Sequence, residues 1–204
     1  MRHSKETAMR KLKLQVQMSV DGYVAGPNGE LDWMVWNWDD QLKDYVNKLT
    51  EPVDCILLGR KMTDGFIAHW ATVAANPDDP EYLSGKKFTN TKKVVFTKTL
   101  DKSEWANTDI ANGDLVDEIN KLKNQDGKDI IVYGGATFVS SLIKEGLIDE
   151  YHLFINPTAL GKGLTIFKGL EERQDLILAK STPYDCGIVV HRYEPKRAGQ
   201  SQTA

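Results

Sequence analysis

The sequence is poor in the features that mark secreted, membrane-spanning and metal-binding proteins. Its two cysteines, Cys55 and Cys186, each lie in an apolar run and lack the paired spacing of a zinc or dithiol site. No apolar run reaches the roughly 18 residues of a membrane span, and residues 1–11 contain no apolar signal segment. We therefore expect reduced core thiols, no metal site, and a cytoplasmic protein without a membrane partner.

The chain also lacks a strong excess of charge of either sign. Its 26 Lys and Arg residues and 29 Asp and Glu residues give a formal net charge of -3, which disfavours a broad nucleic-acid-binding surface. An apolar content of 41% and a charged content of 27% are ordinary for a globular protein. At 204 residues the chain suits one domain. We expect that domain over 11–194, between a disordered leader at 1–10 and a disordered tail at 195–204.

Hydrophobic periodicity predicts strands that alternate with helices over most of the chain. The expected strands are 12–18, 53–59, 92–98, 130–133, 150–157, 176–181 and 187–193. The expected helices are 42–49, one beginning near 60, one that begins at Asn112 or Gly113 and is closed by Gly127, and one that follows Gly134 and Gly135 and ends near Gly146. Strands separated by helices are parallel, whereas the last two strands are close enough to pair as an antiparallel hairpin. The sequence thus predicts an α/β fold with a mixed, mostly parallel sheet flanked by helices and an antiparallel C-terminal hairpin.

Three of the expected strands end in residues suited to an anionic ligand. These residues are Gly134 and Gly135 after 130–133, Gly59, Arg60, Lys61 and Thr63 at the end of 53–59, and Thr97 and Lys98 at the end of 92–98. Glycine lets backbone N–H groups approach a phosphate, and cations and hydroxyls add charge-assisted contacts. Parallel strands bring their carboxyl ends to one edge, where ligands bind in open α/β sheets. Together the exits predict a phosphate-binding edge, although each alone fits a tight turn without a ligand.

A loop rich in glycine and tryptophan separates the first strand from the first helix. Residues 19–29 contain glycine turns and are long enough to form a lid. Trp33, Trp36 and Trp38 follow, and either form a wall against a planar heterocycle or anchor the core. Asp39 or Asp40 either serves as an acid in a pocket or caps the next helix. The residues themselves leave these alternatives open.

These motifs together resemble the dihydrofolate reductase-like fold, in the branch of the reductase domain of the bacterial bifunctional riboflavin-biosynthesis deaminase-reductase. The resemblance covers about residues 12–193, without the zinc motif of a deaminase, and is therefore to a stand-alone form. The segments that carry it are Ser19-Val20-Asp21-Gly22-Tyr23, Leu57-Leu58-Gly59-Arg60-Lys61-Met62-Thr63, Val94-Val95-Phe96-Thr97, Tyr133-Gly134-Gly135-Ala136, and Leu147-Ile148-Asp149-Glu150 leading to Asn156-Pro157-Thr158-Ala159-Leu160-Gly161-Lys162-Gly163.

The resemblance implies that NADPH binds along the carboxyl edge of the sheet. Contacts to the 2'-phosphate and the phosphate near it are implied for Gly59, Arg60, Lys61, Thr63, Thr97 and Lys98. Contacts to the pyrophosphate and nicotinamide half are implied for Gly134, Gly135, Ala136 and Thr137. In dihydrofolate reductases the matching glycine pair is joined by a cis peptide, so the resemblance extends this expectation to Gly134 and Gly135. Relatives commonly form homodimers, which is therefore also expected.

The resemblance also implies a small-molecule substrate. Asp21 and Trp33 are candidates for binding it, and Asp39 is the candidate catalytic proton donor. Riboflavin-type reductases carry an Asp four residues after the threonine of the second-strand motif, where this chain has Ile67. The expected function is hydride transfer from NADPH to a pyrimidine-ribityl precursor, as in a 5-amino-6-(5-phosphoribosylamino)uracil reductase, or to a pterin-like heterocycle. The alternative is a non-catalytic, dimeric nucleotide-binding protein that retains the cofactor edge.

Overall fold

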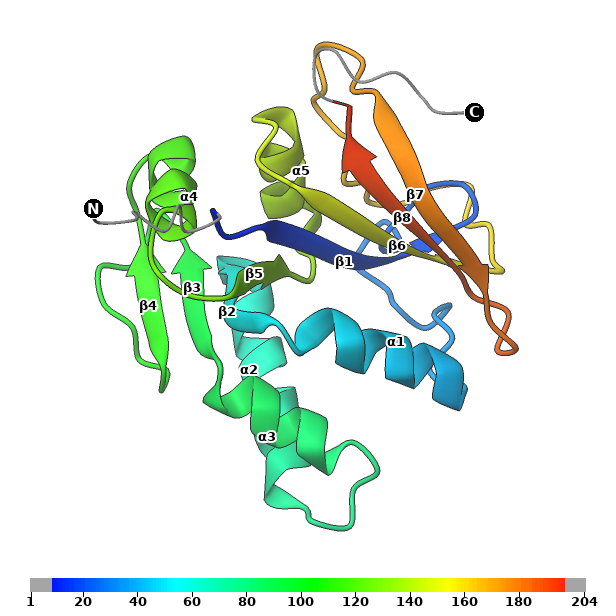
Figure 1. Ribbon diagram of the computed structural model, residues 1–204, viewed down its shortest axis with the longest axis horizontal. Helices are drawn as coiled ribbons and strands as arrows, with labels where there is room; N and C mark the ends of the chain where they lie inside the picture. The colour runs from blue at the N-terminus through cyan, green and yellow to red at the C-terminus, as the bar shows by residue number, and fades with distance from the viewer. Residues whose placement is uncertain (1–8, 197–204) are drawn as a thin grey trace, which may run out of the picture.

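One eight-stranded sheet organises the molecule, with strand order β4-β3-β2-β5-β1-β6-β8-β7 (Figure 1). The structure is a computed structural model and describes residues 9–196. The strands are β1 Leu12–Ser19, β2 Val53–Gly59, β3 Lys92–Phe96, β4 Thr108–Ala111, β5 Asp129–Val132, β6 Glu150–Asn156, β7 Leu176–Pro183 and β8 Val189–Pro195. The helices are α1 Asp40–Thr50, α2 Arg60–Ala75, α3 Tyr82–Asn90, α4 Leu115–Lys123 and α5 Ala136–Lys144.

The sheet is mostly parallel, as the alternation of strands and helices predicts. The six strands from β4 to β6 pair in parallel, whereas β8 is antiparallel to both β6 and β7. At the centre, Leu14 of β1 pairs with Val132 of β5 on one side and with Tyr151 of β6 on the other. The mixed sheet and its antiparallel C-terminal hairpin are therefore confirmed.

Helices cover both faces of the central strands. Leu57 of β2 belongs to an apolar cluster with α4 and α5, whereas its neighbours Ile56 and Leu58 belong to a second cluster with α1 and α3. Because successive side chains of a strand point to opposite faces, a strand covered on both sides must be apolar throughout. A third cluster joins Leu42 of α1 to Phe154 of β6. The long apolar run of β2 thus follows from its place inside a three-layer fold.

Two elements have no counterpart in the predicted pattern, namely β4 and α3. β4 has four residues and pairs only with β3, so it is too short to display a period and needs little apolar surface. α3 contains Gly85, where an added Cβ would lie 2.7 Å from the backbone nitrogen of Ala74 in α2. A residue that weakens helix propensity is therefore required here for close packing between two helices.

The described domain is slightly longer at both ends than the predicted range of 11–194. Arg10, which was assigned to the leader, is buried and forms an ion pair with Asp54. Arg10 is therefore part of the folded domain, because its buried guanidinium is paired with that carboxylate. Pro195, which was assigned to the tail, is the last residue of β8. The rest of the expected leader and tail, residues 1–8 and 197–204, lies outside the described residues.

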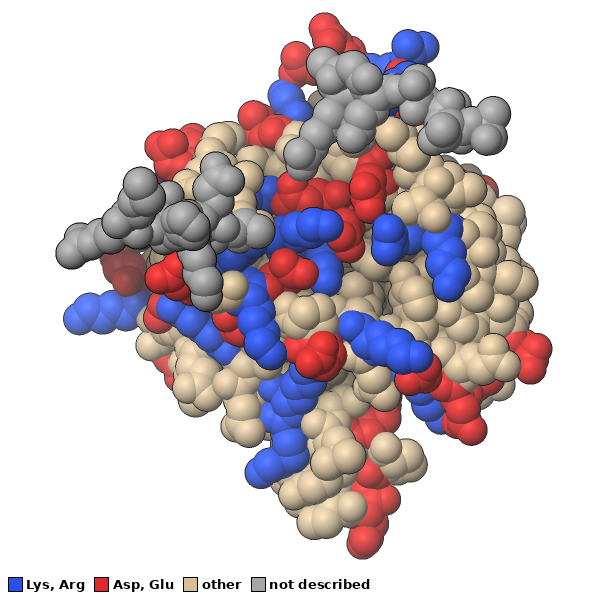
Figure 2. Space-filling view, viewed as in Figure 1, with Lys and Arg blue, Asp and Glu red and all other residues tan. Residues whose placement is uncertain are grey.

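Charged side chains of both signs are mixed on the face of the molecule drawn in Figure 2, with Lys and Arg next to Asp and Glu near its centre. Such mixing agrees with the small net charge of -3. Within residues 9–196, no helix has the length and apolar character needed to cross a membrane.

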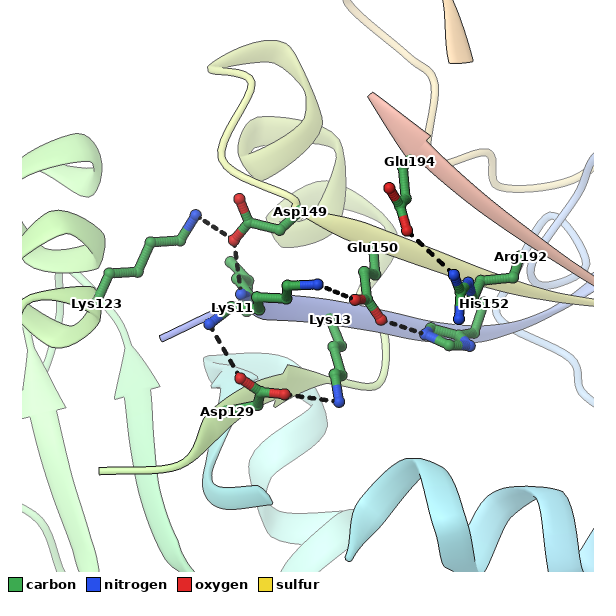
Figure 3. A network of polar contacts seen from close by, with 10 residues as sticks. Lys11, Lys13, Lys123, Asp129, Asp149, Glu150, His152, Arg192 and Glu194 are labelled. Carbon is green, nitrogen blue, oxygen red and sulfur yellow. Dashed lines mark hydrogen bonds and ion pairs between the residues drawn. The ribbon is translucent and has the colours of Figure 1, made fainter. Parts of the chain in front are cut away.

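Ion pairs fasten the amino ends of the central strands to one another (Figure 3). Lys13 Nζ of β1 lies 2.7 Å from Asp129 Oδ2 of β5, and Lys11 Nζ lies 2.7 Å from Glu150 Oε1 of β6. Lys13 and Glu150 are both buried. Each of these groups therefore depends on its partner, because an unpaired buried charge is costly. The network is at the opposite end of the strands from the predicted ligand edge.

His152 extends this network towards α1. Its Nδ1 lies 2.6 Å from the Tyr45 hydroxyl, and its Nε2 lies 3.3 Å from Glu150 Oε2. A neutral ring with its proton on Nε2 satisfies both contacts, because it accepts from Tyr45 and donates to Glu150. Burial lowers the pKa of His152, and the hydrogen bond from His152 is the main cause that lowers the pKa of Glu150 to about 2.

This arrangement predicts a loss of stability on mild acidification. Below the ordinary histidine pKa of 6.5 the unfolded chain takes up a proton at His152 that the folded protein resists, so the free energy of unfolding falls from pH 7 to pH 5. The contribution of Glu150 is lost only below its ordinary pKa of 4.5. Urea unfolding at a series of pH values should show a flatter slope over pH 5–7 for His152→Gln. His69→Gln, at an exposed site on α2, is the control, and equal slopes for both variants would contradict the assignment.

Candidate functional site

The structure brings the three predicted strand exits to one edge of the sheet. β2 lies between β3 and β5, so the carboxyl ends of these three parallel strands are neighbours (Figure 1). Gly59 pairs with Phe96 at the end of β3, and Gly134 follows β5 after one intervening residue. We call this set of carboxyl ends, with Gly59, Gly134 and Gly135, the glycine edge.

Gly59 is required by close packing at this edge. A Cβ at position 59 would lie 3.0 Å from Cβ of Phe138 in α5, closer than ordinary contact. The Phe138 ring stacks on Phe96 with a centroid separation of 4.9 Å, so α5 lies across the ends of β2 and β3. This aromatic pair was not among the predicted site residues, because its members are 42 positions apart and only the fold brings them together.

Gly134 and Gly135 turn the chain from β5 into α5 through backbone angles that favour glycine. Their φ angles are 155° and 82°. The cis peptide expected between them is not present, since every described peptide bond is trans. The two positive φ values make the turn instead. Ala136 and Thr137 then form the start of α5, half-buried and exposed respectively.

The two helices that begin at the glycine edge lack side-chain caps. α2 begins after Gly59 and α5 after Gly135, and neither glycine supplies a capping hydrogen bond. By contrast, α1 and α4 are capped by the carboxylates of Asp39 and Asp114. The first N–H groups of a helix have no intrahelical partner and carry the positive end of its dipole. Two adjacent uncapped starts are therefore suited to an anion.

Arg60 is held at the first turn of α2. Its Nη1 lies 2.8 Å from Asp64 Oδ2, and its Cζ lies 5.2 Å from the centre of the Trp105 ring. Trp105 lies on the connection from β3 to β4. Because β4 was not predicted from the sequence, this contact between Arg60 and Trp105 was not predicted either. Lys61 is exposed on the same turn. The edge therefore carries one cation of fixed orientation and one on the surface.

Two of the predicted hydroxyls, those of Thr63 and Thr97, have partners within the protein. Thr63 is fully buried, and its Oγ1 donates to the Gly59 carbonyl at 3.2 Å. Thr97 is also buried, and its Oγ1 lies 3.1 Å from Thr99 Oγ1. A threonine hydroxyl near a turn or helix start is drawn to local backbone and side-chain partners, which explains the difference from the prediction.

Lys98 is also partly committed within the protein. Its Nζ donates to the Asn112 carbonyl at 2.9 Å and to the Gly113 carbonyl. These contacts tie the exit of β3 to the exit of β4. Lys98 therefore adds positive charge next to the glycine edge while it stabilises the edge itself.

Asp39 is a helix cap rather than a free acid. Its Oδ1 accepts from the Leu42 N–H at 2.8 Å, and its Oδ2 accepts from the Cys186 N–H at 3.1 Å. The hydrogen bond from Leu42 is the main cause that lowers the pKa of Asp39. A carboxyl group with a lowered pKa is ionised at neutral pH, so Asp39 is poorly suited to donate a proton. Of the two predicted roles, capping is the one that the geometry supports.

The three tryptophans differ in their surroundings. Nε1 of Trp33 donates to the Glu30 carbonyl at 3.1 Å, and Nε1 of Trp38 donates to the Val35 carbonyl at 2.8 Å. Trp38 also packs on Phe154, whereas the exposed Trp36 stacks on Trp38. Trp38 is thus a core anchor, and Trp33 keeps its polar atom within its own loop.

Asp21 points to a second loop rather than away from the protein. Its carboxylate accepts from the N–H groups of Leu160 and Gly161, which follow β6. The loop at 19–29, expected as a lid, is therefore fastened at this point.

Gly59, Gly134 and Gly135 line neither of two surface hollows found in the described part of the chain. The hollows have volumes of about 430 and 290 Å³, and they lie beside Trp105 and Asp109 and beside Lys144 and Glu171, respectively. The glycine edge is formed by the carboxyl ends of β3, β2 and β5, and its Gly135 is exposed whereas Gly59 and Gly134 are buried. Its geometry is suited to an extended ligand that lies along several strand ends.

Comparison with known proteins agrees with this architecture. Residues 10–190 match the family described as the RibD C-terminal domain. An uncharacterised Bacillus subtilis (strain 168) protein, YyaP, is 34% identical over 183 residues, which is 88% of this chain and 92% of YyaP.

Solved structures are similar over nearly the whole chain. A putative riboflavin biosynthesis protein from Shewanella sp. PV-4 has a TM-score of 0.68 and 26% identity, covering 92% of this chain and 99% of that one. A Thermotoga maritima diaminohydroxyphosphoribosylaminopyrimidine deaminase/5-amino-6-(5-phosphoribosylamino)uracil reductase has a TM-score of 0.65 and 19% identity, covering 92% and 57%.

An Enterococcus faecalis dihydrofolate reductase complexed with NADP(H) has a TM-score of 0.58 and 16% identity, covering 92% of this chain and 97% of that one. The expected dihydrofolate reductase-like fold is thereby confirmed. The match over 10–190, together with the order of the strands and the glycine edge, establishes that the chain belongs to the RibD C-terminal domain family.

Proposed function

We propose that the protein is a cytoplasmic NADPH-dependent reductase that transfers a hydride to a pyrimidine-ribityl precursor or to a pterin-like heterocycle. Family membership supports the coarser statement, a function like that of a pyrimidine reductase. The observation that carries the finer proposal is the pair of adjacent, uncapped helix starts at Gly59 and Gly135. The cation Arg60 lies beside the first of them.

The residues at this edge fit a dinucleotide phosphate. The free N–H groups of α2 and α5 would bind phosphate oxygens, and Arg60 would pair with the 2'-phosphate that distinguishes NADPH from NADH. Gly134 and Gly135 would let the backbone approach the ligand without a Cβ between them. NADPH, when bound, supplies the hydride, and the protein binds and orients the reactants.

The proton that accompanies the hydride is proposed to come from water. Asp39 is held ionised by its two backbone donors, so it is a poor acid at neutral pH. Under this proposal Asp39 supports the site by fixing the start of α1. Its replacement should then act through stability rather than through the pH dependence of turnover.

A turnover assay tests the proposed function. The purified protein is mixed with NADPH and either 5-amino-6-(5-phosphoribosylamino)uracil or dihydrofolate, and absorbance at the nicotinamide band is followed. Loss of absorbance that depends on both the protein and the heterocycle is the expected result. Binding of NADPH without turnover of either heterocycle would refute the reductase of these two substrate classes.

The second candidate function is a non-catalytic, dimeric nucleotide-binding protein. Two observations favour it, namely Ile67 at the position where riboflavin-type reductases carry an Asp and the capping role of Asp39. For both candidate functions we propose a homodimer, which sedimentation measurements would test. Turnover in the assay above would exclude the second candidate.

A further inference from the structure

We propose that Asp21 is a positioning residue that joins two loops into one wall on the substrate side of the glycine edge. The two loops are 19–30, which follows β1, and 157–164, which follows β6. We call them the joined loops. The proposed effect on turnover rests on the proposed function, whereas the joining itself does not.

The carboxylate of Asp21 is saturated by donors from both loops. Ser19 Oγ of its own loop donates to Oδ1 at 2.7 Å. From the other loop, Leu160 N–H donates at 3.0 Å to Oδ1, and Gly161 N–H donates at 2.6 Å to Oδ2. Although Asp21 is exposed, the hydrogen bonds from Ser19, Leu160 and Gly161, in that order, lower its pKa to about 2. The contact therefore persists across the physiological pH range.

Backbone hydrogen bonds continue the connection on both sides of Asp21. Val20 N–H donates to the Thr158 carbonyl at 2.8 Å. Farther along, Leu164 exchanges hydrogen bonds with the opposite loop, donating to Ala25 at 2.9 Å and accepting from Val24 at 2.8 Å. These bonds form a short ladder between segments about 140 positions apart. The two loops thus form a single unit instead of two independent lids.

The packing at Gly163 leaves little freedom in this unit. An added Cβ there would lie 2.3 Å from the Ala25 carbonyl oxygen, a backbone atom that cannot move aside alone. The loops therefore approach as closely as backbones can. Without the Asp21 carboxylate, however, the segment between Thr158 and Leu164 would have no side-chain anchor at Leu160 or Gly161 among the contacts of the described residues.

The joined loops stand next to the glycine edge but not on it. They extend from the carboxyl ends of β1 and β6, and β1 is the immediate neighbour of β5. Neighbouring strands lie about 4.8 Å apart, so the ends of β5 and β6 are separated by about 10 Å, the length of a two-ring heterocycle. A reactant that meets the cofactor at Gly134 would therefore extend towards the joined loops.

The test compares Asp21→Ala with Asp32→Ala, which removes an exposed acid just beyond the first loop. In Asp21→Ala, hydrogen exchange at the Leu160 and Gly161 amides should be about tenfold faster or more, as expected for loss of a charged acceptor. Exchange in β1 and β6 should not change, and Asp32→Ala should match the wild-type protein. Unchanged exchange at both amides in Asp21→Ala would overturn the joining role.

The second measurement separates positioning from general structural damage. For Asp21→Ala the KM for 5-amino-6-(5-phosphoribosylamino)uracil should rise by about tenfold, while the NADPH dissociation constant changes less than about twofold. An equal loss of NADPH affinity would overturn the assignment of this wall to the substrate side. A wild-type protein that fails to bind NADPH would refute the proposed function, and the exchange result would still decide whether Asp21 joins the loops.

Discussion

Gly135→Ala is expected to weaken NADPH binding by about tenfold or more while the protein still folds. Gly135 has φ 82° and ψ 87°, a conformation that costs an L-residue about 1–3 kcal/mol. A Cβ there would meet its nearest neighbour, Phe138, at an ordinary 3.8 Å, so the change introduces backbone strain without a clash. Relief of that strain would rotate the first N–H groups of α5 away from the glycine edge. Isothermal titration with NADPH measures the loss.

The matched control lies at the other end of the same helix. Gly146 also has a positive φ, 63°, and an added Cβ would meet no heavy atom within 4 Å. Gly146→Ala should therefore lose a comparable free energy of unfolding and keep its NADPH affinity. Equal affinities for the two variants, whether weakened or not, would contradict the role of the α5 start.

Arg60→Ala is expected to weaken NADPH binding by about 10- to 100-fold and NADH binding by much less, because it would remove the charge-assisted hydrogen bond that we propose between Arg60 and the 2'-phosphate. The guanidinium is already oriented by Asp64 at 2.8 Å and by the Trp105 ring, so little side-chain entropy is lost on binding. Titration of each variant with both nucleotides gives the ratio of the two dissociation constants. For Arg60→Ala, the dissociation constant for NADH divided by that for NADPH should fall towards one.

Two variants control for charge at Arg60. Lys86→Ala removes an exposed cation from α3, away from the edge, and should leave the nucleotide preference unchanged. Asp64→Asn removes the acid that orients Arg60 and should weaken NADPH binding less than Arg60→Ala does, since the guanidinium itself remains. A parallel loss of NADPH and NADH affinity in Arg60→Ala would contradict recognition of the 2'-phosphate.

The main body of the sheet could be predicted because its signals are local. The continuous apolar run of β2 indicates burial on both faces. Gly59 and Gly135 mark positions where a side chain would obstruct packing or strain the backbone. β4 escaped prediction because four residues at a sheet edge carry almost no pattern. α3 escaped because Gly85 lowers helix propensity and is explained only by the helix packed against it.

The partners of polar side chains could not be predicted in the same way. Asp21 binds amides 139 and 140 positions away, and Asp39 binds an amide 147 positions away. The sequence identifies a carboxylate in a loop but not the donors that will surround it. For Asp39 those donors favour the capping role over the acid role. For Asp21 the donors indicate a contact between two loops, whereas the sequence had suggested a contact with the substrate.

Titration of the wild-type protein with NADPH and with NADH, under identical buffer and salt, is the most direct test of the proposal that the glycine edge binds NADPH. We expect saturable binding of NADPH at one site per chain, about tenfold or more tighter than binding of NADH, because only NADPH offers a 2'-phosphate to Arg60. Absence of binding for both nucleotides would contradict the glycine edge as a cofactor site.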